Sequence, residues 1–419
     1  MNDRRVAVTG IGVITAAGKN LDDTWKKVLL GESAIDIITR FDISNFKVSL
    51  AAEIKDFDPE QYVEEKKEVR RLDRYSQYAL AAVREAVDSS GIDFSDEKLY
   101  RTRMGVIFGS GVGGIETLEA EITKFAENKE KGASKVSPFY VPMLISNIAA
   151  GHISIKYGLE GHGFAPVSAC ATSAHAIGEA YRAIKHGYAD LMIAGGSEAA
   201  ITPTSIAGFQ NMTAMSSATD KNEGLLAFDR RRKGFVMGEG AGALVLENYE
   251  SAKSRGAEIY GEIAGYCANF DAYHITAPEP SGKGAAGAIL GAISDAGIDK
   301  GKIGYINAHG TGTLPNDRTE TLAIKRVFGD LAYGIPISST KGVVGHMLGA
   351  AGAVEAIFCL KVLSGGILPP TANLRESDPE CDLDYIPLTA KEAKTECVLS
   401  VSLGFGATNA ALVLKRCYA

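Results

Sequence analysis

Short apolar runs alternate with helical patterns along the whole chain. The runs are rich in β-branched residues, as in RVAVTGIGV near the start, ADLMIAGGSEA in the middle and AALVLKR at the end. Continuous apolar strands that are separated by helices are typical of parallel strands buried on both faces. The alternation therefore predicts a layered α/β fold in which helices cover a sheet.

Two segments far apart in the chain share one pattern. CATSAHAIGEA begins at Cys170 and HMLGAAGAVEA begins at His346, and each follows an apolar strand region and opens a helix rich in Ala and Gly. A Glu-Ala pair follows at the same offset in both segments. The repetition predicts two duplicated βαβ-type halves, residues 1–255 and 256–419, with Cys170 and His346 at equivalent strand-to-helix turns.

Composition narrows the class of protein. Hydrophobic residues make up 46% of the 419 residues and charged residues 23%, which is typical of a globular chain. The formal net charge of −7 disfavours general binding to nucleic acid. No apolar run approaches the length of about 20 residues that a membrane span needs, and glycines interrupt the apolar start, unlike a signal peptide. We expect a cytoplasmic protein without a membrane segment.

The six cysteines form no CxxC pair and no His/Cys grouping at zinc spacing, so neither a disulfide framework nor a metal site is predicted. One of them, Cys170, ends an apolar run and begins a helix pattern. At a helix start a thiol faces unpaired backbone N–H groups and the positive end of the helix dipole, which lower its pKa. A reactive thiol and an inert buried cysteine both fit this position.

Two of the seven histidines combine a special position with polar neighbours. His309 follows an apolar strand in INAHGTGT, where Thr311 and Thr313 offer hydroxyls to a ligand. His346 lies five residues after Lys341 at a helix start, a position that favours a neutral imidazole donating to an oxyanion. A structural turn histidine is the alternative for His309. The remaining histidines are expected to be structural or exposed: His152, His162, His175, His186 and His274.

Two glycine-containing segments carry weaker signals. SLGFGATNAAL places Phe405 between two glycines ahead of the final strand. Such a turn presents a backbone N–H to an oxyanion and lets the aromatic ring move. GIGVITAAG near the start invites a nucleotide-binding interpretation, but Thr15 stands where GxGxxG needs its third glycine, so a tight turn is expected instead.

Together these motifs resemble the β-ketoacyl–acyl carrier protein synthases, in particular the elongating condensing enzymes of bacterial fatty acid synthesis. The resemblance spans the chain in the family's order, through VAVTGIGVITAAG, SPFYVPMLISNIAAGHISIKYGLEG, VSACATSAHAIGEA, FDRRRKGFVMGEGAGALVLE, DAYHITAPEPSG, NAHGTGTLPND, STKGVVGHMLGAAGAVEA and GFGATNAAL. It implies a thiolase-like, five-layered α-β-α-β-α fold of two similar halves, usually as a homodimer. It also implies chemistry that needs no cofactor and no metal.

The resemblance assigns roles to the residues singled out above. Cys170 is expected to accept an acyl chain from the phosphopantetheine arm of acyl carrier protein. His309 and His346 are expected to bind the thioester carbonyl of malonyl-acyl carrier protein and to promote loss of its carboxylate. The backbone N–H groups of Cys170 and Phe405 are expected to form the oxyanion hole. The resemblance implies that Lys341 and Glu355 organise the site electrostatically. It also implies that Thr311 and Thr313 hold the pantetheine.

The resemblance also predicts a pocket and a docking surface. Ile115 and Phe209 are expected to line the acyl pocket, with Phe139 or Tyr140 reaching toward the pocket of a partner subunit. Ordinary core packing is the alternative for these residues. A basic patch is expected to attract the acidic carrier protein, and it consists of Lys67, Arg70 and Arg71.

The chain departs from the family pattern at its last motif, where VSLGFGATN stands for the usual NSFGFGGTN. Leu403 replaces an aromatic residue and Ala407 a glycine, which predicts a stiffer gating loop. Val401 replaces an asparagine that helps to bind a structural monovalent cation, so we expect that site to be weakened. Its other members match Asn307, Glu355 and Ser400. Thr213 stands where some members carry an arginine that touches the carrier protein.

Three alternatives stay open from the sequence. The nearest is the catalytic ketosynthase subunit of a type II polyketide or polyene system, whose motifs overlap these. A noncatalytic subunit that sets chain length is a second, but such subunits characteristically lose the nucleophile, which this chain keeps at Cys170. A Cys–His hydrolase is the third, and the second histidine placed for a malonyl carbonyl counts against it.

Overall fold

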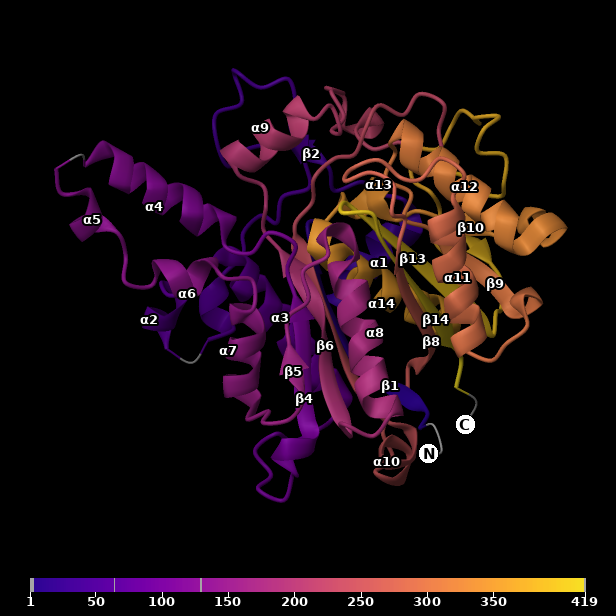
Figure 1. Cartoon of the computed structure of the whole chain (residues 1–419), viewed down its shortest axis with the longest axis horizontal. Coiled ribbons are helices and arrows are strands. Elements are labelled where there is room, and N and C mark those ends of the chain that lie inside the picture. Colours follow the sequence, from indigo (N-terminus) through magenta and orange to yellow (C-terminus); the bar gives the residue numbers. More distant parts are fainter. Residues whose placement is uncertain (1–3, 64, 129, 418–419) are drawn as a thin grey trace.

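The computed structural model describes residues 4–63, 65–128 and 130–417. Its largest element is a ten-stranded sheet that joins strands from distant parts of the chain (Figure 1). From edge to edge the order is β5 (Gly163–Phe164), β4 (Met104–Gly109), β6 (Leu191–Glu198), β7 (Gly240–Asn248), β1 (Val6–Thr15), β8 (Gly261–Phe270), β14 (Thr408–Lys415), β13 (Cys397–Gly404), β9 (Ile303–Asn307) and β10 (Ile337–Ser338).

The two sides of this sheet have the same pairing pattern. On one side β5, β4 and β6 are parallel, whereas β7 and β1 add in antiparallel fashion. On the other side β10, β9 and β13 are parallel, whereas β14 and β8 are antiparallel. The sides meet where β1 pairs with β8 over a short stretch, Val6–Val8 against Gly261–Ile263. The duplication that the sequence predicts is thus visible in the topology, while the division at residue 255 stays a prediction.

Helices complete the layers. The outer faces are covered by α3 (Arg74–Ser90) and α7 (Ile148–Tyr157) on one side, and by α11 (Lys283–Asp295) with α12 (Leu314–Phe328) on the other. Between the sides lie α8 (Thr172–Lys185) and α14 (Ala351–Gly365), which contact strands of both. Figure 1 shows this succession of helix, sheet, helix, sheet and helix. The predicted five-layered α/β fold is confirmed.

The directions of several strands differ from the prediction made from the sequence. The apolar runs at Val6–Thr15, Gly240–Asn248 and Thr408–Lys415 were expected to be parallel, but these strands pair in antiparallel fashion. Their side chains are apolar because helix layers cover both faces of the sheet. Burial on two faces selects apolar residues in either direction, so the composition of a strand does not fix its orientation.

The echo between Cys170 and His346 has a structural counterpart. A short 3₁₀ turn, η3 (Ala169–Ala171), leads into α8, and a second, η7 (Leu348–Ala350), leads into α14. The two turns contact each other. The duplicated fold therefore brings two remote parts of the sequence to the same end of the middle layer.

The helix α14 and the turn before it form one apolar stretch. Leu348–Gly365 is long and apolar enough to cross a membrane, contrary to the expectation that no run approaches that length. Its mean hydropathy is 1.5, and 83% of the 18-residue window is buried inside the protein. Its position between two sheets accounts for this composition, since a helix buried on all sides is hydrophobic all round.

Shorter elements surround the layers. The helix α3 is capped at its C-terminal end by Gly91, which has a left-handed conformation with φ 66°. An arm of α4 (Ile115–Glu127), α5 (Gly132–Lys135) and α6 (Tyr140–Leu144) protrudes beside α7 (Figure 1). The remaining helices used below are α1 (Leu21–Leu30), α2 (Lys66–Val69), α9 (Pro203–Asn211), α10 (Tyr249–Ser254) and α13 (Lys341–Val344). Two small sheets pair β2 (Asp36–Ile37) with β3 (Leu50–Ala51) and β11 (Ile367–Leu368) with β12 (Lys391–Glu392).

We predict that the middle layer tolerates no added methyl group at Gly178. A Cβ there would lie 2.3 Å from the ring of Tyr266 on β8, which is far inside van der Waals contact. Gly178→Ala is expected to lower the free energy of unfolding by about 2 kcal/mol or more through overpacking. Denaturant unfolding measures the change.

The matched control is Gly151→Ala on α7, where a Cβ would meet no atom within 4 Å. Because alanine is a better helix former than glycine, this variant should unfold at an equal or higher denaturant concentration. Equal stability of the Gly178→Ala protein and the wild type would contradict the close packing of α8 on β8.

Candidate active site

Cys170 lies in the turn η3, directly before α8. The preceding residue, Ala169, has a φ of 49° in the left-handed region, a conformation that costs energy for a residue with a side chain and marks a constrained turn. The Cys170 thiol is buried, and its Sγ lies 3.1 Å from Nε2 of His346. The fold thus places a thiol beside an imidazole from the other half of the chain.

The environment of the thiol differs from the sequence-based expectation. Burial raises the pKa of Cys170 to about 12, although the charge of Lys341 and the backbone N–H of Phe405 oppose this shift. The prediction of a lowered pKa is wrong, because loss of water disfavours the thiolate more than these groups stabilise it. The free site holds a neutral thiol.

Both candidate histidines are buried and held by their backbones. His309 follows β9, and its N–H donates to Oε1 of Glu320 at 2.7 Å. His346 lies between α13 and η7, and its N–H donates to the carbonyl of Val236 at 2.8 Å. The two imidazole rings meet edge to face, with centroids 5.3 Å apart. The imidazoles of His309 and His346 therefore lie next to each other, and in the neutral form each can donate or accept a hydrogen bond.

The neutral state predicted for His346 agrees with its surroundings, but the cause differs, and His309 shares that state. Burial, followed by the positive charge of Lys341, holds the pKa of His346 well below its usual range. The same two causes, with His346 in addition, lower the pKa of His309 in the same way. Both imidazoles are therefore neutral near pH 7, through desolvation more than through a helix start.

Lys341 and Glu355 form a buried ion pair behind the histidines. Each is 1% exposed, and Nζ of Lys341 contacts Oε1 of Glu355. Burial raises the pKa of Glu355, and Lys341 opposes that shift. Removal of one partner would leave an unpaired buried charge, which is strongly destabilising.

Phe405 directly follows β13 at the edge of the site. Its backbone N–H faces the Cys170 thiol, and its half-buried ring lies 6.3 Å from the ring of Phe209, centroid to centroid. Ala407, two residues on, has a φ of 62°, where a glycine would be unstrained. The stiffer loop expected from Ala407 stays a prediction.

A cavity of about 390 Å³ opens from these residues to the surface. Cys170, His309 and His346 line it together with Phe405. Of the residues assigned to substrate by resemblance, three also line it: Phe209, Thr311 and Thr313. The hydroxyls of Thr311 and Thr313 lie 3.0 Å apart. The predicted thiol, imidazoles and hydroxyls thus share one cavity.

Other predicted residues lie outside this cavity. Ile115 begins α4 and packs against the core cluster that contains Cys170, without lining the cavity. Lys67, Arg70 and Arg71 lie on and after α2, beside α6 in Figure 1, and do not line the cavity either. The Arg71 guanidinium stacks 4.7 Å from the centre of the Phe139 ring. Their roles stay predictions.

The structure bears on the remaining polar positions as well. The side chain of Val401 is fully buried and offers no oxygen, whereas the side chains of Asn307 and Ser400 hold buried atoms without a hydrogen-bond partner among the described residues. Ligand atoms of Cys170, His309 and His346 lie within 4.8 Å of one another, close enough for one metal ion. Chemistry without a metal or cofactor stays a prediction.

The sequence did not predict two buried carboxyl groups near the site, those of Glu198 and Glu320. Glu198 ends β6 and accepts hydrogen bonds from Ser110 Oγ at 2.8 Å and from the N–H of Gly349 at 3.0 Å. Burial raises the pKa of Glu198 to about 7, and that of Glu320 also to about 7. An acidic residue at the end of an apolar strand, as in LMIAGGSE, was the available signal for Glu198.

A buried cysteine beside two neutral histidines, at the carboxyl ends of strands in a duplicated five-layered fold, is the arrangement of a condensing acyltransferase. Family models agree with this class. The "Beta-ketoacyl synthase, N-terminal domain" matches residues 3–252, and the "Beta-ketoacyl synthase, C-terminal domain" matches residues 260–375. The chain belongs to the β-ketoacyl synthase family, which confirms the resemblance drawn from its motifs.

Individual relatives match nearly the whole chain. It is 44% identical over 417 residues to "3-oxoacyl-[acyl-carrier-protein] synthase 2" of Synechocystis sp., covering 99% of both chains. It is 46% identical over 414 residues to the protein of the same name from Staphylococcus aureus, again covering 99% of both. Among solved structures, a type II polyketide ketosynthase bound to its acyl carrier protein and a hexaketide matches with a TM-score of 0.91 and 32% identity, covering 99% of this chain and 100% of that one.

The buried neutral histidines predict a pH dependence of stability. The folded state leaves His309 unprotonated because its pKa lies well below 6.5, whereas the unfolded chain binds a proton there below about pH 6.5. Stability is therefore full above that pH and falls as pH decreases. Relative to His309→Asn, the wild type should lose about 1.4 kcal/mol for each pH unit below about 6.5.

Urea unfolding of both proteins between pH 5 and 8 measures this difference. Other titrating groups contribute to both proteins and cancel in the comparison. Between pH 7 and 8 the two curves should run parallel, which serves as the internal control. Parallel curves down to pH 5 would show that the folded state protonates His309 as readily as the unfolded chain does.

Proposed function

We propose that this chain joins an acyl thioester to malonyl-acyl carrier protein by decarboxylative Claisen condensation, giving β-ketoacyl-acyl carrier protein in fatty acid elongation. The single observation that carries the proposal is the contact of 3.1 Å between Cys170 Sγ and His346 Nε2 at a cavity shared with the neutral His309. A thiol supplies the nucleophile and leaving group that acyl transfer needs.

The first step transfers the acyl chain. The Cys170 sulfur attacks the thioester carbonyl carbon, and a new carbon–sulfur bond forms as the bond to the pantetheine sulfur breaks. The proton of the Cys170 thiol ends on that leaving sulfur. The negative charge that develops on the carbonyl oxygen is received by the backbone N–H groups of Cys170 and Phe405. In support, the Phe405 N–H faces the thiol in the free site, where preorganised donors are most effective.

The second step forms the carbon–carbon bond. The bond between the malonyl α-carbon and its carboxylate breaks, CO₂ leaves, and the electron pair becomes an enolate whose oxygen accepts hydrogen bonds from His309 and His346. The α-carbon then attacks the acyl carbonyl carbon, and the Cys170 sulfur departs and takes up a proton from solvent. Neutral donors suit this step because a strong cation beside the carboxylate would stabilise the ground state that must lose CO₂.

The buried pair behind the histidines has an electrostatic role in this scheme. Burial is the main reason that both imidazoles are neutral, and the charge of Lys341 lowers the pKa of each further. Glu355 balances that charge and fixes the ammonium group. Thr311 and Thr313 at the cavity wall offer hydroxyls to the amides of the pantetheine arm.

Fatty acid elongation is favoured over polyketide synthesis by the sequence relatives. The chain is 44–46% identical to proteins named 3-oxoacyl-[acyl-carrier-protein] synthase 2, against 32% for the polyketide ketosynthase with its carrier protein. That structure has a TM-score of 0.91, so the backbone suits either substrate class. The difference lies in the partner proteins and in the chains that are loaded.

We predict that Cys170→Ala abolishes both loading and condensation. Intact-protein mass spectrometry after incubation with saturated acyl carrier proteins should show one acyl adduct on the wild type and none on the variant. Addition of malonyl-carrier protein should extend the chain on the wild type by one two-carbon unit. The rate of this condensation should be lower in the variant by at least about a thousandfold.

Folding of the variant is checked by its unfolding curve, since alanine removes a buried sulfur and leaves a small cavity. Condensation by a folded Cys170→Ala protein at the native rate would refute the nucleophile. Loading only in the presence of a second ketosynthase-like subunit, or release of unreduced poly-β-keto chains, would move the protein to polyketide synthesis.

We further propose a homodimer in which two copies pair through the edge strand β5. This strand ends the ten-stranded sheet, and its Phe164 is 44% exposed, with the nearby Val167 59% exposed. On α7, which packs on the neighbouring β4, Ile155 is 82% exposed. An open sheet edge with exposed apolar residues promotes association, and a partner would also bring its Phe139 or Tyr140 toward the pocket.

Phe164→Asp is predicted to weaken this dimer by tenfold or more, because it places a charge at the centre of the apolar edge. Sedimentation velocity over a range of concentrations measures the dissociation. The matched control is Tyr333→Asp, which alters a side chain of similar exposure, 54%, outside β5 and its neighbours. A Phe164→Asp protein as dimeric as the wild type would place the interface elsewhere.

Two finer assignments complete the proposal. Lys67, Arg70 and Arg71 attract the acidic carrier protein, supported by the exposure of all three on or beside α2. The protein works in the cytoplasm, supported by six free cysteines, which fit a reducing compartment.

A further inference from the structure

A single cation stands in the wall of the active-site cavity. Among the described residues that line it, Lys233 is the one lysine or arginine side chain. Asp271 is the one carboxylate in the same wall, and it is already engaged, accepting from Asn409 Nδ2 at 2.7 Å and from the N–H of Glu279 at 2.9 Å. Both donors to Asp271 are neutral groups, and no ion pair between Asp271 and Lys233 occurs among the described residues.

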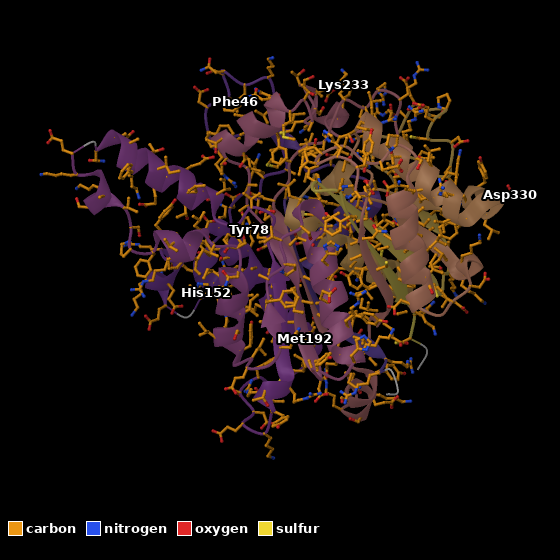
Figure 2. All side chains as sticks on the ribbon, viewed as in Figure 1. Phe46, Tyr78, His152, Met192, Lys233 and Asp330 are labelled. Carbon is orange, nitrogen blue, oxygen red and sulfur yellow. The ribbon has the colours of Figure 1, made fainter. Side chains whose placement is uncertain are left out.

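Lys233 is exposed at the end of the molecule where α9 lies, as Figure 2 shows. No hydrogen bond or ion pair of its ammonium group occurs within residues 4–63, 65–128 and 130–417. Its neighbours on both sides behave differently, since Arg231 pairs with Asp229 and Arg232 with Asp378. In a segment of three consecutive basic residues after Arg230, only the one at the cavity is left available.

The backbone around Lys233 passes from an exposed residue to a buried one, and both line the cavity. Gly234 donates its N–H to the carbonyl of Gly312 at 3.0 Å, which anchors the segment on the turn between Thr311 and Thr313. One residue further, the buried ring of Phe235 lies 5.3 Å from the ring of His346, centroid to centroid. Phe235 follows the exposed Lys233 by two positions in the chain, and it lies beside the imidazole of His346.

The conformation of Gly234 fixes this placement. Its φ is 134°, and a Cβ there would lie 2.6 Å from the backbone of Met215. Only glycine lets the segment pass so closely, and the contact sets the direction in which Lys233 leaves the wall. The backbone beside Lys233 is thus fixed, and Lys233 is exposed, whereas the thiol of Cys170 and the imidazoles of His309 and His346 are buried.

We propose that Lys233 binds the phosphate ester at the outer end of the pantetheine arm while the thioester lies at Cys170. The inference rests on the proposed function, because it needs an acyl chain that arrives on such an arm. A thioester at the floor leaves the rest of the arm along Thr311 and Thr313, and its phosphate then emerges beside Lys233. An unpaired ammonium is a suitable point charge for a phosphate oxygen.

Charge position separates this site from the malonyl carboxylate. That carboxylate reacts at the floor, beside His309 and His346, whereas Lys233 is exposed at the other end of the segment. A cation at the mouth strengthens binding of either thioester equally and does not stabilise the carboxylate that must be lost. Lys233 is therefore a substrate-binding residue that acts on KM more than on kcat.

The test compares three donors that carry the same octanoyl chain: octanoyl-pantetheine, octanoyl-phosphopantetheine and octanoyl-carrier protein. The rate of Cys170 acylation is measured by mass spectrometry for the wild type, Lys233→Gln and Lys233→Arg. The matched control is Lys253→Gln on α10, at the opposite end of the molecule in Figure 1.

At low salt, Lys233→Gln should lose about fivefold in kcat/KM with both phosphate-bearing donors and nothing with octanoyl-pantetheine. Lys233→Arg should retain most of the activity, and Lys253→Gln should match the wild type. Higher salt should shrink the preference of the wild type for the phosphorylated donor.

Three results would overturn the proposal. Equal losses with all three donors would show that Lys233 only supports the cavity wall. A loss confined to octanoyl-carrier protein would mean that Lys233 contacts the protein surface of the carrier instead of the phosphate. No loss with any donor would remove Lys233 from binding altogether. Failure of every donor to acylate wild-type Cys170 would instead refute the proposed function, and so the two failures are distinguishable.

Discussion

Close packing of two helices between the two sides of the sheet is the constraint on which the rest of the structure depends. A Cβ at Gly178 of α8 would overlap the ring of Tyr266, and one at Gly352 of α14 would lie 2.8 Å from the Cβ of Ala174. Small residues at these contacts let α8 and α14 share one layer. Because the two helices are related by duplication, their starting turns meet, and Cys170 and His346 come together.

The same packing buries the side chains of the site, and their burial sets its electrostatics. Burial raises the pKa of Cys170, Glu198 and Glu320 and lowers that of the two histidines. The neutral form of each group is favoured. Lys341 with Glu355 is the charged exception, and there the two charges balance one another. The Cys170 thiol and the two imidazoles thus owe their neutral states to one cause, burial.

The local pattern of the sequence predicted those features that recur in it. The shared motif after Cys170 and His346 predicted a turn before each of two related helices, and the turns η3 and η7 are found there. Cys170 lies within η3, whereas His346 lies two residues before η7, so the two residues are not at equivalent positions. Features that depend on contacts between remote segments were not accessible. The direction of β1 and β7, the raised pKa of Cys170 and the anchoring of Gly234 on Gly312 all arise from such contacts. Ile115 shows the same limit, since its apolar character fits both a pocket wall and the core packing observed.

The cavity that ends at Cys170 has a kinetic consequence. Both thioesters of the proposed reaction must reach the same sulfur past Phe405, Thr311 and Thr313. Their two arms cannot occupy one wall at once, so the first carrier has to leave before the second enters. The order of events is then a ping-pong cycle, in which the acylated enzyme persists alone between visits. Malonyl-acyl carrier protein that arrives before the acyl donor occupies the donor's place in the cavity. The flux therefore depends on the ratio of the two carrier proteins as much as on their total concentration.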